Sequence, residues 1–429
     1  MVTGSVADAS GVGRRPFLVY WAGQSISSLG DAFALVAMPL LVLESTGSVA
    51  KMGMVSALAV VAQVLASVFA GPLVDSVDRR RLMMACDLGR AAIYLAVPLL
   101  WLARGPSLLA LSAAAFVGGA LGNIFTVAYV AAIPSLVGNQ RLNEANAKLQ
   151  GTQALAYVLG PLLAGAVAAN VGAAWALALN ALSFIVSVVS LQLVRFGGPV
   201  RPGPGRHDQS PAHGETDRRW AGPRFVWRHP VLRPLLLLMI ALGLTGNIGL
   251  GAGVTDLFVY RLKHDFALSD RTVGLCLGVA AVGAVLGAVG AARLRRRAGF
   301  GACFLGGTAV QEVGLVLIGL VPRAAATALG ALLWSAGMLV RAIPATSLRQ
   351  TLTPHPLLGR VVATFWALTF GASAVGTTLV TRAAAATGTR LTFLGIGLSV
   401  GAVVVAGSFT AARTRHPEGT SGPATADPG

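Results

Sequence analysis

Two carboxylates lie inside long apolar stretches of the sequence, where an acidic side chain is costly. Asp31 falls near the middle of the first stretch, and Glu312 falls inside the ninth, next to Gln311. A charged side chain at the centre of a bilayer costs about 2.5–3.5 kcal/mol on insertion scales, so such a residue usually faces a cavity or a partner. Asp31 and Glu312 are therefore candidates for proton coupling. The alternative for each is a buried carboxylate with a structural partner.

A second group of charged residues surrounds the stretch GPLVDSVDRRR, which connects two apolar stretches. Its members are Gly71, Asp75, Arg79, Arg80, Asp87 and Arg90. Asp87 and Arg90 are one helical turn apart and can pair on one face. We expect the group to form a latch, in which Asp75 holds an arginine or a helix N-terminus while the cytoplasmic side is closed. The alternative is a topology signal made of solvated charges.

Isolated polar side chains inside the other apolar stretches are candidates to line a substrate cavity. They are Gln24, Ser27, Asn123, Thr126, Tyr157, Asn247, Trp334 and Arg341. Taken singly, a polar residue at such a position more often binds a neighbouring helix. The fifth apolar stretch also carries Gly151, Gly160, Pro161 and Gly165. A Gly-Pro pair weakens a helix locally, so these four predict a hinge or a sealing face.

The sequence carries no constellation typical of an enzyme or a metal centre. Its three cysteines, Cys86, Cys276 and Cys303, lie in separate apolar stretches and suggest neither a disulfide framework nor a metal site. No glycine-rich phosphate loop ending in Lys and Ser/Thr is present, so ATP is not the expected energy source. No histidine is placed to complete a hydrolase triad. We expect no enzymatic activity, no cofactor and no metal.

The composition indicates a membrane protein. Of 429 residues, 55% are hydrophobic and 11% are charged, and the mean hydropathy is +0.72. A soluble domain carries about 25% charged residues. The net charge of +17 would suit nucleic-acid binding, but the arginines lie between the apolar stretches and not on one face. Short basic loops are typical of the cytoplasmic side of membrane proteins, so no nucleic-acid partner is expected.

Twelve apolar stretches reach the length of about 20 residues that a helix needs to cross a bilayer. They are residues 17–43, 51–74, 82–103, 107–132, 150–170, 172–194, 234–258, 271–292, 301–321, 324–346, 361–382 and 390–411. Helices are required because open sheet edges cannot face lipid. The predicted fold class is an all-α membrane protein with twelve transmembrane helices in two pseudo-symmetric six-helix bundles.

The chain repeats itself at half its length. A shift of 216 residues carries Gly71 onto Gly287 and the arginines at 79–81 onto those at 295–297, as in transporters built from two related halves. The predicted segments are a cytoplasmic N-terminal tail (1–16), a first bundle (17–194), a cytoplasmic linker (195–233), a second bundle (234–411) and a disordered cytoplasmic tail (412–429). The later part of the linker, Trp220 to His229, is a candidate interfacial helix.

The distribution of Lys and Arg predicts the orientation. One side of the predicted topology holds 23 of these residues and the other holds 8. Because cytoplasmic loops are enriched in positive charge, both termini are expected in the cytoplasm. The N-terminal segment does not read as a cleavable signal. The expected location is a bacterial cytoplasmic membrane, with the protein acting as a monomer.

The twelve stretches, the central linker and the charged hairpin together resemble the major facilitator superfamily. Gly71, Asp75, Arg79 and Arg80 match its Gly–Asp–Arg–Arg signature between spans two and three. The stretches GQSISSLGD, IPSLVGNQRLNEANA and LTPHPLLGRVVA resemble bacterial exporters of macrolides and of enterobactin. The resemblance implies two bundles that open alternately to each side. It also implies that spans one, four, seven and ten line the central cavity and that span nine, with Glu312, lies outside it.

Span five resembles in part the antiporter signature of drug–proton exchangers. Gly151, Gly160, Pro161 and Gly165 match it, whereas Ala156 stands where the signature has a glycine. Many drug–proton antiporters of the superfamily also carry an arginine in span four, and residues 107–132 contain none. The resemblance implies proton exchange, but not through that arginine.

These observations predict a secondary active transporter that exports a small apolar or amphipathic molecule, such as a drug, an antibiotic or another metabolite, by proton antiport. The sparse charge within the spans argues against phosphate, nucleotides or highly charged sugars as cargo. Two alternatives stay open. One is an importer or facilitator of a small nutrient, and the other is a non-transporting membrane sensor or lipid-handling protein.

Overall fold

The computed structural model describes residues 14–137, 142–194, 215–246, 253–354, 357–410 and 413–415. Within these ranges every regular element is a helix, which confirms the predicted all-α class. The helices form from long runs of apolar residues. Short turns separate these runs, and polar side chains in the turns cap the helix that follows. Ser48, Asp78 and Ser269 each accept a hydrogen bond from a backbone N–H in the first turn of the helix that follows.

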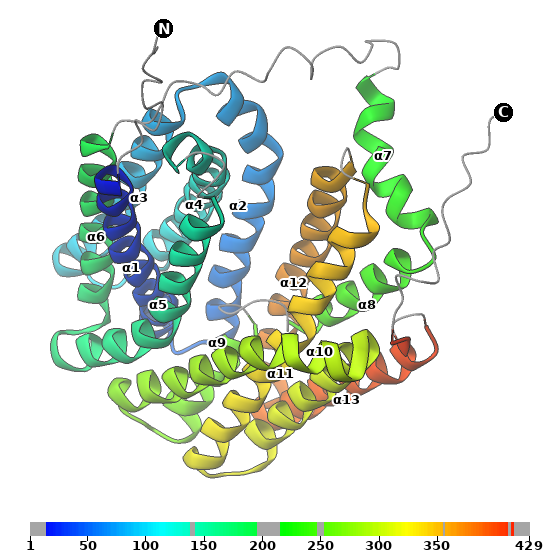
Figure 1. Cartoon of the computed structure of the whole chain (residues 1–429). Helices are drawn as coiled ribbons and strands as arrows, with labels where there is room; N and C mark the ends of the chain where they lie inside the picture. The colour runs from blue at the N-terminus through cyan, green and yellow to red at the C-terminus, as the bar shows by residue number, and fades with distance from the viewer. Residues whose placement is uncertain are drawn as a thin grey trace, which may run out of the picture.

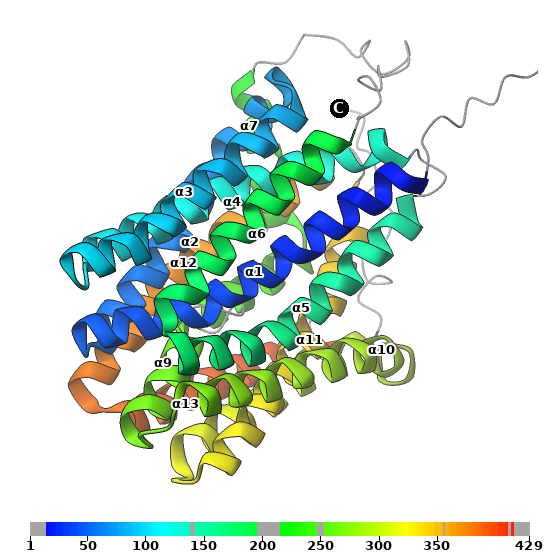
Figure 2. The same ribbon diagram turned by 90° about the vertical axis from the view of Figure 1, so that its left-hand side faces the viewer.

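The first half of the chain forms six helices. They are α1 (Arg14–Thr46), α2 (Val49–Ser76), α3 (Arg79–Arg104), α4 (Leu108–Val137), α5 (Leu142–Val171) and α6 (Ala173–Leu193). Helix α1 packs between α5 and α6, as Figure 2 shows, while α4 packs against both α2 and α3. The helix that carries Asp31 thus lies between α5 and α6.

The second half begins with two helices bent sharply against each other. Helix α7 (Glu215–Arg228) covers most of the stretch where the sequence suggests an interfacial helix, and a bend of 102° separates its last turns from α8 (Leu232–Leu244). The remaining elements are α9 (Val254–Tyr260), the π-helical turn η2 (Arg261–Asp265), α10 (Asp270–Leu320), α11 (Ala324–Leu352), α12 (Leu358–Thr387) and α13 (Thr389–Ser408). Helix α10 consists of two arms that meet at Gly299, whose φ of 83° is favourable for glycine alone.

The helix boundaries reproduce the repeat seen in the sequence. A shift of 216 residues moves both bounds of α5 onto those of α12, and the first residues of α4 and α6 onto those of α11 and α13. By the same shift, α8 with α9 is the counterpart of α1, and the two arms of α10 are the counterparts of α2 and α3. The two halves of the chain are thus copies of one six-helix plan.

Nine helices of the described ranges are long and apolar enough to cross a membrane, and the bent pair of α7 and α8 raises that number to ten. Helix α10 counts once there although it has two arms, so twelve crossings stay a prediction. The predicted seventh span, 234–258, is not one continuous helix. Helix α8 ends at Leu244 and α9 begins at Val254, with residues 247–252 outside the described ranges.

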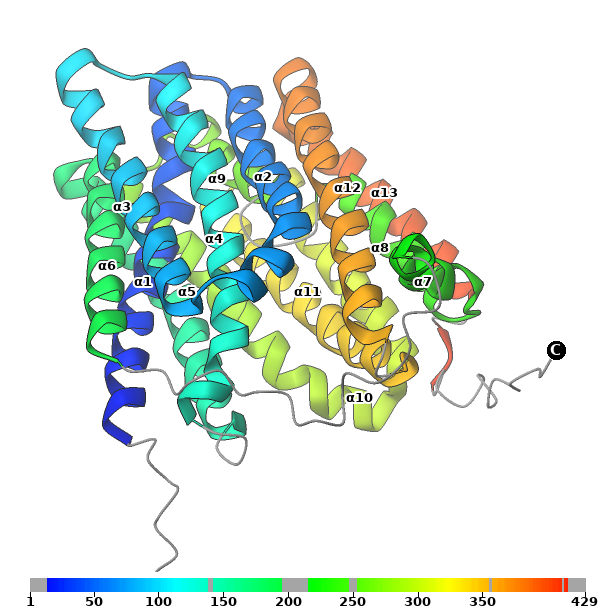
Figure 3. The ribbon, with the colours of Figure 1, turned by 90° about the horizontal axis from the view of Figure 1, so that it is seen from above.

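The two halves meet toward one end of the molecule, which we call the closed face. It carries the turn between α1 and α2, together with α9 and η2, whereas the opposite hairpin face carries the α2–α3 hairpin and α7 (Figure 1). Near the closed face, Gly53 of α2 lies directly against Thr381 of α12, and Gly165 of α5 lies against Gly274 of α10. Seen from above, α1–α6 gather on one side and α11–α13 on the other (Figure 3).

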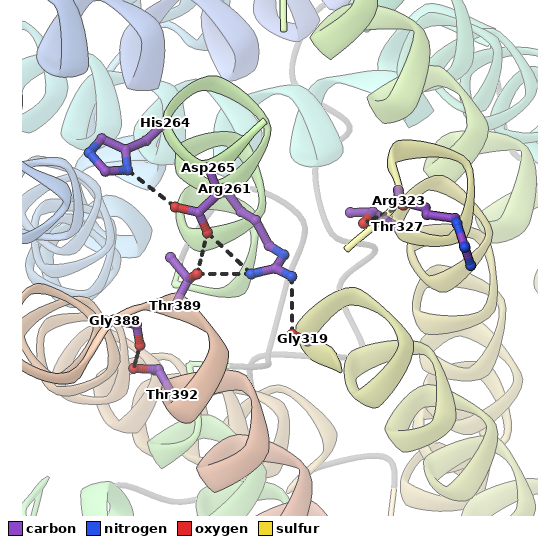
Figure 4. Close-up of polar contacts among 9 residues, drawn as sticks. All are labelled: Arg261, His264, Asp265, Gly319, Arg323, Thr327, Gly388, Thr389 and Thr392. Atoms are coloured by element: carbon purple, nitrogen blue, oxygen red, sulfur yellow. Dashed lines mark hydrogen bonds and ion pairs between the residues drawn. The ribbon is translucent and has the colours of Figure 1, made fainter. Parts of the chain in front are cut away.

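A buried arginine ties together three helix ends at the closed face of the second half (Figure 4). Arg261 of η2 pairs with Asp265 at 3.1 Å, donates to the hydroxyl of Thr389 at 3.0 Å and donates to the carbonyl of Gly319 at 3.0 Å. Thr389 begins α13 and Gly319 ends α10. This cluster fixes η2, and with it the adjoining α9, to the second half of the molecule.

Candidate functional site

The structure brings two carboxylates to one guanidinium inside the first half. Asp31 of α1 forms a direct ion pair with Arg90 of α3, and Asp87 of α3 lies 3.6 Å from the same guanidinium. The Arg90 side chain is only 9% exposed and that of Asp87 is fully buried, whereas that of Asp31 is 45% exposed. Asp31 is therefore the member of this triad that water reaches.

Neighbouring helices hold the arginine from both sides. The guanidinium lies over the ring of Phe184 of α6 at 3.9 Å, which is a favourable cation–π contact. Toward α4 it faces Gly122, where a methyl group would lie 3.7 Å from its central carbon. A methyl group at this position would be in ordinary contact with the guanidinium, so Arg90 lies directly beside α4. Helix α4 has no arginine of its own, but Arg90 of α3 places a guanidinium beside α4.

The triad carries an unbalanced charge. Two ionised carboxylates and one guanidinium sum to one negative charge, and one added proton makes the group neutral. Burial penalises net charge because the protein and lipid interior screens it poorly. The arrangement is therefore suited to bind and release a single proton at a carboxylate that shares an arginine with another.

These contacts correct the predicted latch. Arg90 pairs with both Asp31 and Asp87 in the middle of the bundle, away from the hairpin arginines, because Arg90 stands halfway along α3. Arg80 instead donates to the carbonyls of Leu191 and Gln192 at 2.7 and 2.5 Å, at the C-terminal end of α6. A cation at that end of a helix is favourable.

The other latch residues lie at the hairpin face. Gly71 and Asp75 belong to the last turns of α2, but their side-chain surroundings lie outside what the structure describes. Arg79 begins α3 and is partly buried. The latch through Asp75 stays a prediction.

Glu312, the second coupling candidate, lies in a different environment. Its carboxylate packs against Gly401, where a methyl group would come within 2.8 Å of one carboxylate oxygen. This contact joins the second arm of α10 to α13. Glu312 thus lies between the counterparts of α3 and α6, apart from the Asp31 triad of the first half.

Four of the cavity candidates are buried between helices, so they do not line an open cavity. Gln24 donates to the hydroxyl of Ser187 at 2.9 Å, and Ser27 is buried nearby, so both belong to the seam between α1 and α6. Trp334 and Arg341 are each 2% exposed in α11. The reason is the close glycine packing of α11 on α10, which covers this face of α11.

The other cavity candidates divide into two pairs. On α4, Asn123 is half-buried and Thr126 is exposed, and the Thr126 hydroxyl donates to the carbonyl of Gly122 beside Arg90. The cavity role of these two residues stays a prediction. Asn247 and the side chain of Tyr157 lie outside the described residues.

The glycines of span five lie at two helix contacts. Gly160 packs directly on Ala32 of α1, next to Asp31. One turn further, Gly165 and the carbonyl of Pro161 face Gly274 of α10, where a methyl group would lie 2.6 Å from that carbonyl oxygen. Gly151 has open space around it. Gly160, Pro161 and Gly165 thus place α5 in contact both with α1, which carries Asp31, and with α10 of the other half.

Asp256 is a buried acidic residue that was not among the predicted site residues. Asp256 of α9 is fully buried although it belongs to the predicted seventh span. The signal that selected Asp31, an acid inside an apolar stretch, also marks Asp256. Because Asp256 lies close to the expected end of that span at residue 258, the sequence did not indicate that it would be buried.

Comparison with known proteins identifies the family. The model of the Major Facilitator Superfamily matches residues 20–377. The chain belongs to the Major Facilitator Superfamily. It is therefore a multi-pass membrane transporter and not an enzyme, as the sequence predicted.

Two groups of relatives share most of this transporter's length. The multidrug efflux pump Tap of Mycolicibacterium fortuitum is 28% identical over 397 residues, which cover 90% of this chain and 93% of Tap. The enterobactin exporter EntS of Shigella boydii is 25% identical over 359 residues, 83% of this chain and 81% of EntS. A mutant of the nucleoside transporter NupG shares the fold, with a TM-score of 0.75 at 10% identity over 91% of this chain and 98% of NupG.

Proposed function

We propose that this protein is a secondary active exporter of small apolar or amphipathic molecules, driven by proton antiport in a bacterial cytoplasmic membrane. The observation that carries the coupling is the triad of Asp31, Arg90 and Asp87, which has room for one exchangeable proton. The similarity to Tap and EntS supports export of drugs or metabolites. The hairpin face and both termini are cytoplasmic, as the excess of Lys and Arg on that side predicts.

The packing of the halves supports an inward-open state. The close contacts of Gly53 with Thr381 and of Gly165 with Gly274 lie toward the closed face, which is then the outer side. The half-exposed carboxylate of Asp31 is reached by water from the cytoplasm in this state. Rocking the halves about these contacts would present the same carboxylate to the outside.

Proton exchange at Asp31 couples the export of cargo to the entry of a proton. With the cytoplasmic side open, Asp31 releases its proton to water, and the ionised carboxylate together with the exposed Thr126 of α4 receives the cargo. After the outer side opens, a proton from outside binds Asp31, the carboxylate loses its charge and the cargo is released. Asp87 keeps Arg90 paired throughout. For an uncharged cargo, one charge moved across 100 mV supplies about 2.3 kcal/mol, enough to hold the cargo about 50-fold more concentrated outside.

Proteoliposomes test the proposal. The purified transporter is reconstituted with a panel of drugs and amphipathic dyes, ethidium among them, and a proton gradient of either sign is imposed. We expect cargo movement against the proton flow and loss of this gradient dependence in Asp31→Asn, with Glu312→Gln as the matched control. Cargo that moves with the protons would indicate an importer. No cargo movement at all would favour a sensor or lipid-handling protein.

A further inference from the structure

A second buried carboxylate lies where the two halves meet, away from the Asp31 triad. Asp256 belongs to α9 in the second half and is 0% exposed. Helix α9 packs against α2 and α1 of the first half and against α12 and η2 of its own half. The hydroxyl of Ser56 on α2 lies beside the carboxylate, together with the backbone N–H of Gly253. Neither makes a hydrogen bond of normal geometry to it, and both oxygens lack a hydrogen-bond partner.

No counter-charge reaches Asp256 from the helices around it. Among the described residues, charged groups of α1, α2, α12 and η2 near the closed face are either exposed or engaged elsewhere. Glu44, Lys51 and Arg382 are exposed, Arg261 and His264 bind Asp265, and Lys263 pairs with Asp270. The groups beside the carboxylate are the hydroxyl of Ser56 and the backbone of Gly253, and the hydroxyl of Thr377 lies next to Gly253.

An ionised carboxylate in this position would be buried without compensation, which is among the most costly arrangements in a protein. A protonated carboxyl group is neutral, and its O–H can donate to the neighbouring hydroxyl. The closed contact between α2 and α9 therefore favours the protonated form. Separation of these helices would expose the group to outer water, where a carboxyl ionises freely.

We propose that Asp256 is a proton-binding gate: it takes up one proton from outer water when α9 closes on α2, and it returns that proton to the same side when the two helices separate. Because the proton comes from and goes to one side, this site sets the fraction of outward-open transporter and does not carry protons across the membrane. The inference rests on the proposed alternation between inward- and outward-open states. It assigns to the outer side a sensor of external acidity that is distinct from Asp31.

Two glycines with positive φ flank the segment that precedes α9. Gly246 and Gly253, on either side of the break after α8, have φ values of 66° and 56°, and the carbonyl of Gly246 accepts from Val254 at 3.3 Å. Glycine adopts these angles without strain. Since Arg261 fixes η2 and the adjoining α9 to the second half, α9 leaves α2 when the two halves separate.

The opening of the outer side can be measured without cargo and without a gradient. Lys51 and Arg382 are exposed near Gly53 and Thr381, which touch in the closed state. Both are replaced by cysteine in a chain whose buried Cys86, Cys276 and Cys303 are changed to serine, and spin labels report their distance in lipid nanodiscs. Linkage to a single proton changes the closed-to-open ratio by up to about tenfold per pH unit.

We expect the closed population of the parent to fall as pH rises from about 5.5 to 8.5. Asp256→Asn should stay closed across this range, and Asp256→Glu should keep the pH dependence. The proposal is overturned if Asp256→Asn follows the same pH curve as the parent, or if the parent shows none. Loss of the pH dependence in Asp31→Asn would overturn it as well, because the sensor would then be Asp31, and this arm does not require Asp256→Asn to fold.

Failure of the gate and failure of the exporter are distinguishable. Gate movement is read from the spin-label distance in the absence of cargo, whereas export is read from vesicles under a proton gradient. An Asp31→Asn protein that keeps the pH-dependent gate but loses gradient-driven cargo movement would support both assignments separately. Glu312→Gln serves as the carboxylate control in both experiments and should change neither.

Discussion

Replacing Gly274 by alanine should open the outer side of the transporter. A methyl group there would lie 2.6 Å from the carbonyl oxygen of Pro161 and 2.8 Å from the Cα of Gly165, and both are backbone atoms of α5 that cannot rotate away. Overpacking of this kind costs about 1–3 kcal/mol. The cost falls on the state in which α5 and α10 touch, so the closed-to-open ratio should drop by about 5–150-fold.

The spin-label pair at positions 51 and 382 measures this shift. Gly290→Ala is a matched control in the same arm of α10, because nothing lies within 4 Å of a methyl group at Gly290. We expect Gly274→Ala to move the distance distribution toward longer separations and Gly290→Ala to leave it unchanged. If the two variants gave the same distribution, the contact between α5 and α10 would not be part of the gate.

Three further outcomes follow from the same contacts. Asp31→Asn should lower the gradient-driven accumulation of an uncharged cargo in vesicles by up to about 50-fold at 100 mV, while Glu312→Gln has little effect. Equal losses in both variants would refute the triad as the coupling site. Gly160→Val should lower the free energy of unfolding of the purified protein by about 1–3 kcal/mol, because the added side chain collides with α1. Gly151→Ala should leave it unchanged. A larger loss in Gly151→Ala than in Gly160→Val would contradict the packing of α5. His229 accepts from the backbone N–H groups of Val231 and Leu232 at 3.2 and 3.3 Å and so caps α8, and partial burial lowers the pKa of His229. The unfolded chain therefore binds the proton more readily, so this cap should be present at neutral pH and be lost as pH falls below about 6.5. Thermal unfolding from pH 5 to 8 checks this, and a pH dependence that survives in His229→Asn would refute it.

The fold was predictable because the membrane allows so few solutions. Long apolar stretches must be helices in lipid, and the shift of 216 residues found in the arginine clusters also relates the bounds of α5 and α12. The sequence could not foresee the break between α8 and α9, since an apolar stretch shows length and not continuity. The kink at Gly299, by contrast, falls between the predicted spans 271–292 and 301–321.

The sequence could identify single residues of the site, but not which of them form ion pairs with each other. An acid in an apolar stretch is recognisable because it is costly, and Asp31 was found in this way. Its partner is Arg90, 59 residues away in the chain, and local spacing suggested only the pair of Arg90 with Asp87. For Gln24 and Trp334 the sequence showed a polar or aromatic group inside a helix, but only packing shows that α6 and α10 cover them.

Proton release on cargo binding tests the shared-proton site most directly. The purified transporter is mixed with the best-exported compound of the panel in weakly buffered detergent solution, and the pH change is recorded with a dye. If Asp31 exchanges its proton for cargo, about one proton per bound molecule should appear in solution, and Asp31→Asn should bind cargo without releasing any. Cargo binding by the parent without proton release, or equal release by Asp31→Asn, would contradict coupling through the triad of Asp31, Arg90 and Asp87.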